Sequence, residues 1–241
     1  MLVVKDVSKS FGGIRALNKV SVSIGDSEIV GLIGPNGSGK TTLFNVISGA
    51  LKPDSGSVIF NDSRIDGLPP ERISRAGISR TFQGVRLVED ITVLDNIMIS
   101  LLPRSGSFDE AVEVVEEVCS FVGLKELDVR ASDLSDYERR LVEIARALAA
   151  KPKLVLFDEI MAGLGESDQN SIAKLINEIR GRLKISVFWI EHVLRAMFRL
   201  VDVDRVVVLN WGNKIAEGPS DEILKNPQVV EAYLGEVSWV R

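Results

Sequence analysis

The segment GPNGSGKT at residues 34–41 carries the clearest chemistry in the sequence. It fits the phosphate-binding pattern G-x-x-x-x-G-K-[ST], in which glycines let backbone N–H groups surround a phosphate without a Cβ in the way. Lys40 can reach the β- and γ-phosphates of a nucleotide, and the Thr41 hydroxyl can bind Mg²⁺. The segment therefore predicts a nucleotide site whose contacts are Gly34, Pro35, Asn36, Gly37, Ser38, Gly39, Lys40, Thr41 and Thr42.

The alternative for this segment is a glycine-rich turn with an unrelated lysine. The context argues against it, because the apolar run 29–33 predicts a buried strand before the loop and residues 42–48 predict a helix after it, ending at Gly49. A helix that begins at a phosphate loop adds partial positive charge to the same place.

Two adjacent carboxylates, Asp158 and Glu159, follow the apolar run 154–157. An aspartate at the end of a strand near a phosphate loop can hold Mg²⁺ through a water, and the next side chain can polarise an attacking water. Taken alone, the pattern fits an ordinary strand that runs into a polar turn. Together with the phosphate loop it predicts that Asp158 is a metal ligand and Glu159 a catalytic base.

Three further side chains are candidates for the same site. Gln83 could sense the metal and the γ-phosphate, although composition alone favours an ordinary surface glutamine. His192 is the only histidine and follows a predicted core strand, where it could contact a phosphate or the attacking water. Phe11, before two glycines, could stack on an adenine ring or could equally be a core aromatic.

Composition limits the class of protein. The chain has 241 residues, 45% of them hydrophobic, and 29 basic against 34 acidic residues give a net charge of -5. We expect no nucleic-acid partner, since no basic cluster stands out.

Cys119 is the only cysteine, which excludes an internal disulfide and a cysteine-based metal cluster. No apolar run approaches the ~20 residues that span a bilayer, and the start of the chain does not read as a signal peptide.

The elements that must position these residues alternate between strand and helix patterns. The first sixty residues are mostly strand-like, the region from about 95 to 150 is helical, and short apolar strands return after it. A helical insert therefore interrupts an α/β core whose strands are covered on both faces. The predicted strands are 2–7, 16–24, 29–33, 57–60, 154–157, 185–190 and 205–209, and the predicted helices include 42–48 and 167–182.

These residues, in this order, resemble the ATP-binding subunit of an ABC transporter over nearly the whole chain. The resemblance implies a P-loop, RecA-like ATPase core with a β arm and an inserted α-helical subdomain. We expect a single domain in which residues 1–85 and 151–241 form the core and 86–150 the helical part. ATP and Mg²⁺ are the implied cofactors, with Lys40, Glu159 and His192 as catalytic residues, Phe11 and Gln83 as nucleotide contacts, and Thr41, Gln83 and Asp158 around the metal.

Within that family, several segments resemble the branched-chain amino acid importer group. They are residues 11–17, 80–87, 92–96, 190–192 and the tail 232–236. The implied partners are a second ABC ATPase subunit, two membrane-spanning permease subunits and, indirectly, a substrate-binding protein. The implied location is the cytoplasmic face of the cell membrane, as a peripheral protein. Residues 138–148 also resemble the lipopolysaccharide-export ATPase, which is the alternative assignment.

The chain departs from the family in its signature segment, which reads Leu-Ser-Asp-Tyr-Glu at residues 134–138 where the family has Leu-Ser-Gly-Gly-Gln. In the family this segment covers the γ-phosphate bound to the opposite subunit. Asp136 adds a negative charge there, and Tyr137 adds a ring where backbone must approach. Ser135 and Glu138 still predict a capping box. We therefore expect an asymmetric heterodimer with one fully active site; the alternative is an ATP-binding regulatory subunit that hydrolyses little.

Overall fold

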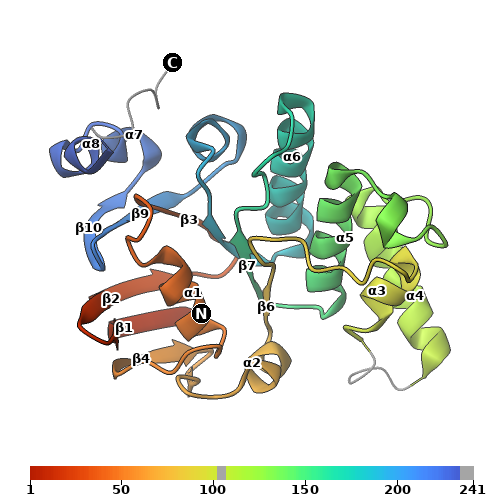
Figure 1. Cartoon of the computed structure of the whole chain (residues 1–241), viewed down its shortest axis with the longest axis horizontal. Helices are drawn as coiled ribbons and strands as arrows, with labels where there is room; N and C mark the ends of the chain where they lie inside the picture. The colour runs from red at the N-terminus through yellow and green to blue at the C-terminus, as the bar shows by residue number, and fades with distance from the viewer. Residues whose placement is uncertain (102–106, 234–241) are drawn as a thin grey trace.

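The computed structural model describes residues 1–101 and 107–233 and places a mixed, largely parallel sheet at the centre (Figure 1). The strand order is β10-β9-β3-β8-β7-β6, and only β10 runs antiparallel to its neighbour. All residues of β3, β7 and β8 are buried, which explains their continuous apolar runs. The strands are β3 (Ile29–Ile33), β6 (Ile78–Arg80), β7 (Leu154–Asp158), β8 (Ser186–Ile190), β9 (Arg205–Asn210) and β10 (Asn213–Gly218).

A second, antiparallel sheet forms the β arm, with strand order β2-β1-β4-β5. Its strands are β1 (Leu2–Phe11), β2 (Ile14–Ile24), β4 (Ser55–Phe60) and β5 (Ser63–Arg64). The strands predicted in the arm are shorter than those in the structure. The register between β1 and β2 shifts after Val4, Val7 and Lys9. These irregularities break the alternation of apolar and polar residues, although the strands stay paired.

The helices fall into two groups. Those around the core are α1 (Lys40–Ile47), α2 (Pro70–Ala76), α6 (Glu166–Leu183), α7 (Ser220–Ile223), α8 (Pro227–Tyr233) and a π-helical turn at Ala196–Leu200. The others pack on one another beside the core: α3 (Val93–Met98), α4 (Phe108–Val122), α5 (Asp136–Ala149) and a 3-10 turn at Ala131–Asp133. The sequence did not predict β6, β10, α2, α7 or α8, which are short.

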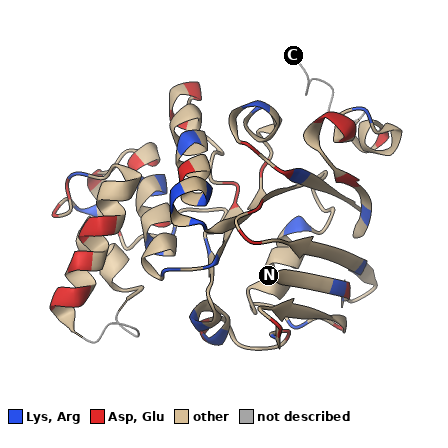
Figure 2. Ribbon diagram, turned by 180° about the vertical axis from the view of Figure 1, so that it is seen from behind, with Lys and Arg blue, Asp and Glu red and all other residues tan. Residues whose placement is uncertain are grey.

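Helix ends in the second group follow their local sequence. Ser107 accepts from the Glu110 amide at the start of α4, and Gly123 ends that helix with φ 88°. The predicted face of α4, made by Ala111, Val115, Val118 and Val122, is buried. Acidic residues recur along the outer side of the same helix (Figure 2). The predicted period of α4 is therefore confirmed, with apolar residues inward and carboxylates outward.

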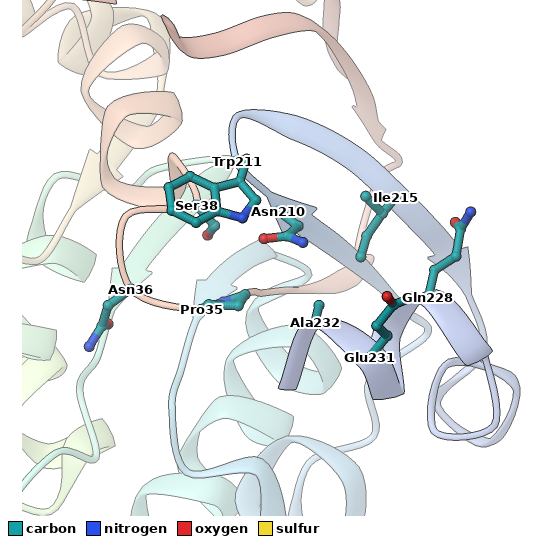
Figure 3. A pocket seen from close by; sticks show the side chains of 9 residues that line it. All are labelled: Pro35, Asn36, Ser38, Asn210, Trp211, Ile215, Gln228, Glu231 and Ala232. Atoms are coloured by element: carbon teal, nitrogen blue, oxygen red, sulfur yellow. The ribbon is translucent and has the colours of Figure 1, made fainter. Parts of the chain in front are cut away.

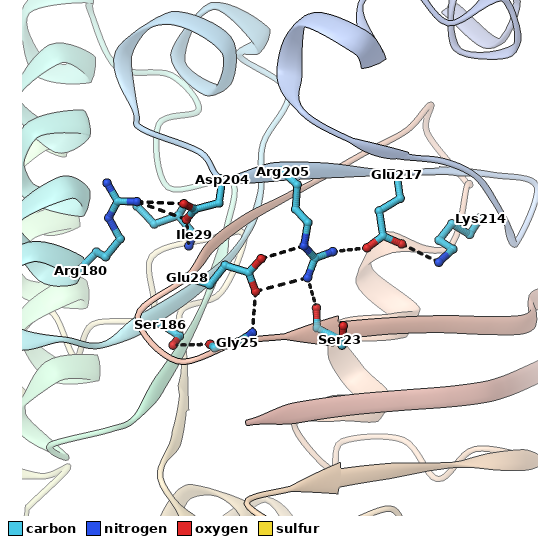
Figure 4. A network of polar contacts seen from close by, with 10 residues as sticks. All are labelled: Ser23, Gly25, Glu28, Ile29, Arg180, Ser186, Asp204, Arg205, Lys214 and Glu217. Atoms are coloured by element: carbon cyan, nitrogen blue, oxygen red, sulfur yellow. Dashed lines mark hydrogen bonds and ion pairs between the residues drawn. The ribbon is translucent and has the colours of Figure 1, made fainter.

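A polar network joins the arm to the core sheet (Figure 4). Arg205, at the start of β9, donates to Glu28 over 2.7 Å, to Glu217 and to the Ser23 carbonyl. Lys214 also binds Glu217 over 2.6 Å. Since Ser23 and Glu28 flank the connection from β2 to β3, the network fixes the strand that leads into the phosphate loop.

Candidate active site

Residues 34–39 form the predicted loop between β3 and α1, and Lys40 and Thr41 are the first two residues of the helix. Gly39 precedes α1 with φ 105°, and a Cβ there would overlap the carbonyl oxygen of Ala16. A Cβ at Gly34 would overlap the carbonyl oxygen of Leu209. Both positions therefore require glycine, and the loop is fitted closely between β2 and β9.

Lys40, whose side chain lies inside this loop, is only 5% exposed. Its Nζ donates to the carbonyl oxygens of Gly34 over 2.7 Å and Pro35 over 3.1 Å. Thr41 is exposed and Thr42 half-buried in the first turn of α1, and the buried Ser38 hydroxyl has no hydrogen-bond partner. A positive side chain, a helix start and an unpartnered hydroxyl together suit an anionic, oxygen-rich ligand.

Asp158, at the end of β7, is 1% exposed and forms a buried ion pair with Arg80, with 2.9 Å between Oδ2 and Nη2. Its other carboxylate oxygen, Oδ1, has no hydrogen-bond partner among the described residues. Burial raises the pKa of Asp158, and the Arg80 guanidinium opposes that shift. An orphaned buried carboxylate oxygen fits the oxygen-ligand preference of Mg²⁺.

Three predicted residues, Glu159, His192 and Gln83, contact one another at the Glu159 carboxylate. His192 Nε2 lies 2.9 Å from its Oε1, and Gln83 Nε2 lies 3.0 Å from its Oε2. The backbone at Glu159 has φ 55°, a left-handed value that is costly for a non-glycine residue, and its N–H donates to the Ile190 carbonyl. The backbone conformation and the two side-chain partners therefore fix the orientation of the Glu159 carboxylate.

Glu191 is a site residue that the sequence reasoning missed. It is 1% exposed, and its carboxylate accepts from the backbone N–H groups of Met161 over 3.2 Å, His192 over 2.9 Å and Val193 over 3.2 Å. Burial raises its pKa, opposed by these three hydrogen bonds. Glu191 thus ties the segment after Glu159 to the segment that carries His192. The sequence signal that could have indicated Glu191 was a carboxylate directly after a mostly apolar strand, β8.

Phe11 lies apart from the Glu159 cluster, at the end of β1 in the arm. Its side chain is 47% exposed, with Lys9 Nζ 5.7 Å from the ring centroid. The alternative prediction, a core aromatic, is therefore wrong, because β1 ends at the surface. The exposed ring remains open to a stacking partner.

A cavity of about 520 Å³ lies on the outer side of the phosphate loop (Figure 3). Its lining comes from the phosphate loop, the turn between β9 and β10, and α8, and it consists of Pro35, Asn36, Ser38, Asn210, Trp211, Ile215, Gln228, Glu231 and Ala232. Trp211 is 80% exposed at its rim. This cavity could not be predicted from the sequence, because α8 is far along the chain from the loop.

The core sheet and the phosphate loop define a P-loop nucleoside triphosphatase. The sequence profile of ABC transporters matches residues 17–162, and that of the branched-chain amino acid ATP-binding cassette transporter C-terminus matches residues 213–237. The chain therefore belongs to the ABC transporter ATP-binding family. Part of the resembling tail at 232–236 lies outside the described residues.

Relatives that match over nearly the full length are named as branched-chain amino acid transport ATP-binding proteins. The high-affinity branched-chain amino acid transport ATP-binding protein LivG of Escherichia coli is 36% identical, with 98% of each chain covered. The high-affinity branched-chain amino acid transport ATP-binding protein BraF of Pseudomonas aeruginosa is 33% identical, with 98% of each chain covered. The probable LivG of Archaeoglobus fulgidus is 36% identical, covering 98% of this chain and 95% of its own.

Solved structures show the same fold. A nucleotide-free ATP-binding cassette from an ABC transporter superposes with a TM-score of 0.89 at 34% identity, covering 97% of this chain and 98% of its own. The ADP conformation of an ATP-binding cassette gives a TM-score of 0.89 at 34% identity, with 98% of each chain covered. The predicted fold class is confirmed: a P-loop ATPase core with a β arm and a group of inserted helices.

Proposed function

We propose that this chain hydrolyses ATP to power an importer of branched-chain or related amino acids, working at the cytoplasmic face of the membrane. The observation that carries the hydrolytic role is the convergence of Gln83 and His192 on the Glu159 carboxylate beside the phosphate loop. The substrate class rests on the names of relatives that match over nearly the full length. No described helix is long and apolar enough to cross a bilayer.

In the proposed reaction the phosphate loop binds the nucleotide, and Lys40 moves from its two carbonyl contacts to the β- and γ-phosphates. Thr41, Gln83 and Asp158 would hold Mg²⁺, Asp158 through a water, and the metal would offset phosphate charge when bound. Glu159 polarises the attacking water. Each carboxylate oxygen has two lone pairs, so Glu159 can accept from the water while it stays bound to His192 and Gln83. Phe11 offers its ring to the adenine.

We propose that the second ATPase subunit of the dimer is a different chain. Ser135 and Glu138 form the predicted capping box at the start of α5, with the Ser135 hydroxyl 2.7 Å from Glu138 Oε2. Asp136 is exposed at the first position of the helix, next to the half-buried Tyr137. The serine therefore serves its own helix, and a negative charge faces any phosphate presented to it. The partner's intact signature would complete this chain's site.

The two permease subunits are proposed to dock between the core and the helical subdomain of residues 86–150. A cavity of about 290 Å³ lies there, close to the segment that ends in Gln83. Phe82 and Arg146 line it, and Phe82 is adjacent to Gln83 in the chain. A permease helix in this groove could therefore shift Gln83 and, through it, Glu159.

Uptake by cells that carry the chain as their only copy tests the proposed function. Glu159→Gln should abolish uptake of labelled leucine, isoleucine and valine and leave uptake of a cation unchanged. Arg64→Lys, an exposed change in the arm, is the matched control and should retain uptake. Undiminished leucine uptake in the Glu159→Gln cells would exclude this substrate class or this role.

A regulatory subunit with little hydrolysis is the second candidate, and the altered residues 136–137 favour it. A partner chain with a complete set of motifs of its own would support that role. A partner that carries an intact signature would support the asymmetric ATPase.

A further inference from the structure

Arg80 occupies a buried position between the phosphate-loop helix and Asp158. Its side chain is 8% exposed at the end of β6. Nη1 donates to Asn45 Oδ1 over 2.6 Å and to Ser48 Oγ over 3.0 Å, both near the end of α1. Nη2 donates to Asp158 Oδ2 over 2.9 Å. One guanidinium thus bridges the helix that follows the phosphate loop and the strand that ends in the carboxylates.

Aromatic rings restrict the same guanidinium. Its central carbon lies 5.7 Å from the Phe44 ring centroid and 5.3 Å from that of Phe82. Phe44 is fully buried in α1 and packs on Phe188 of the core sheet at 5.1 Å between ring centroids. The Phe44 and Phe82 rings therefore restrict the plane of the Arg80 guanidinium, and this fixes the direction of its N–H groups.

The consequence for Asp158 is that its two oxygens have different roles. Arg80 occupies Oδ2, and the backbone N–H of Asp158 donates to Thr81 Oγ1 over 3.2 Å. Oδ1 is buried and has no partner. Leaving a buried acceptor unpartnered is costly, so a ligand that supplies a donor there binds to a carboxylate already oriented for it.

We propose that Arg80 is a positioning residue for the metal site: by holding Oδ2 of Asp158 it leaves Oδ1 to accept from a magnesium-bound water. The inference rests on the proposed function, since it takes Asp158 as the residue that holds Mg²⁺. Lysine cannot replace Arg80, because a single ammonium cannot reach acceptors on α1 and on β7 in one fixed plane. A purely structural role would lower stability and leave the metal affinity of the folded protein unchanged.

The test measures metal and nucleotide affinity separately in the purified chain. Mn²⁺ binding to the ADP complex is followed by electron paramagnetic resonance, and ADP binding in EDTA by calorimetry. Arg80→Lys should weaken Mn²⁺ binding about tenfold, the usual cost of losing a partner of a metal ligand, while metal-free ADP affinity changes less than about twofold. Arg64→Lys is the control for the same change of residue type, because Arg64 also pairs with an aspartate, Asp66, but at an exposed position in the arm.

A second variant covers the case in which Arg80→Lys does not fold. Asn45→Ala removes the 2.6 Å contact to Nη1 and keeps the buried ion pair, so Mn²⁺ affinity should fall about threefold. Unchanged Mn²⁺ affinity in folded Arg80→Lys, or in Asn45→Ala if the former is unfolded, would overturn the inference. Asp158→Asn separates the two proposals: if it also leaves Mn²⁺ affinity unchanged, the assignment of Asp158 as the metal ligand fails as well.

Discussion

His192 Nε2 lies 2.9 Å from Oε1 of Glu159, across the gap between the ends of neighbouring strands β8 and β7. These strands run parallel, so the side chains that follow them meet at one edge of the sheet. The Glu191 carboxylate fixes the backbone at both ends of the gap, through Met161 on one side and His192 on the other. The pairing of the two residues therefore follows from sheet topology as well as from the side chains themselves.

His192→Ala tests whether this contact aims the carboxylate. The variant should lose about a hundredfold in kcat, within the range of general-base contributions, while ADP affinity stays within about twofold. Phosphate release and calorimetry measure the two quantities. Gln83→Ala removes the other partner of Glu159 and is the comparison, with a smaller loss expected because His192 still holds Oε1. Full turnover in His192→Ala would remove the histidine from the mechanism.

Restoring the signature tests the asymmetric dimer. The double substitution Asp136→Gly and Tyr137→Gly removes the charge and the ring that oppose a phosphate in trans, so phosphate release per dimer should rise severalfold, on the order of 1 kcal/mol in the barrier. Asp133→Gly, also an exposed acidic residue just before this segment, is the control and should have no such effect. Turnover that stays the same after the double substitution would contradict the account of this segment.

Gly39→Ala tests the fit of the phosphate loop. The added Cβ would overlap the Ala16 carbonyl at a residue with φ 105°, so the loop must shift and ADP affinity should fall by more than about tenfold. Gly181→Ala is the matched control, because nothing lies within 4 Å of a Cβ there and α6 should gain about 0.5–1 kcal/mol. Calorimetry with ADP and urea unfolding check both. Wild-type affinity in Gly39→Ala would show that the loop tolerates a side chain.

Cys119 gives a pH-dependent prediction. It is 1% exposed on the buried face of α4, and burial raises the pKa of its thiol to about 11. Since its unfolded pKa is about 8.5, the folded state keeps the proton more tightly. Its contribution to stability is therefore complete below pH 8.5 and lost as pH rises towards 11. A thiol reagent should react slowly from pH 7 to 9 in the native protein and at once in urea; rapid native labelling at pH 8 would contradict this burial.

The sequence predicted the chemistry better than the arrangement around it. The phosphate loop, Asp158, Glu159 and His192 were singled out because each lies just after a short apolar run that predicts a buried strand. Arg80 and Glu191 were missed as site residues, because their importance depends on partners 78 and 30 positions away in the chain. β6 was missed for a similar reason: three residues, Ile78–Arg80, carry too little pattern, and only pairing with β7 makes them a strand.

Whether Phe11 lies in the core or at the surface could not be predicted from its neighbours. A phenylalanine before two glycines is compatible with a core or a surface position. The side chain is exposed because it lies at the end of β1. The capping box of α5 was predictable because Ser135 and Glu138 interact within one helical turn.

Magnesium-dependent phosphate release by this chain paired with a subunit that has an intact signature, compared with the same pair carrying Glu159→Gln, tests the central claim most directly. The claim is that this chain carries a complete set of hydrolytic residues around its own phosphate loop. Paired with a subunit that has an intact signature, the wild-type chain should release phosphate steadily, and Glu159→Gln should bind ATP with similar affinity yet lose turnover by at least about a hundredfold. Equal phosphate release by the two proteins would show that Glu159 is not the catalytic base and would contradict the account.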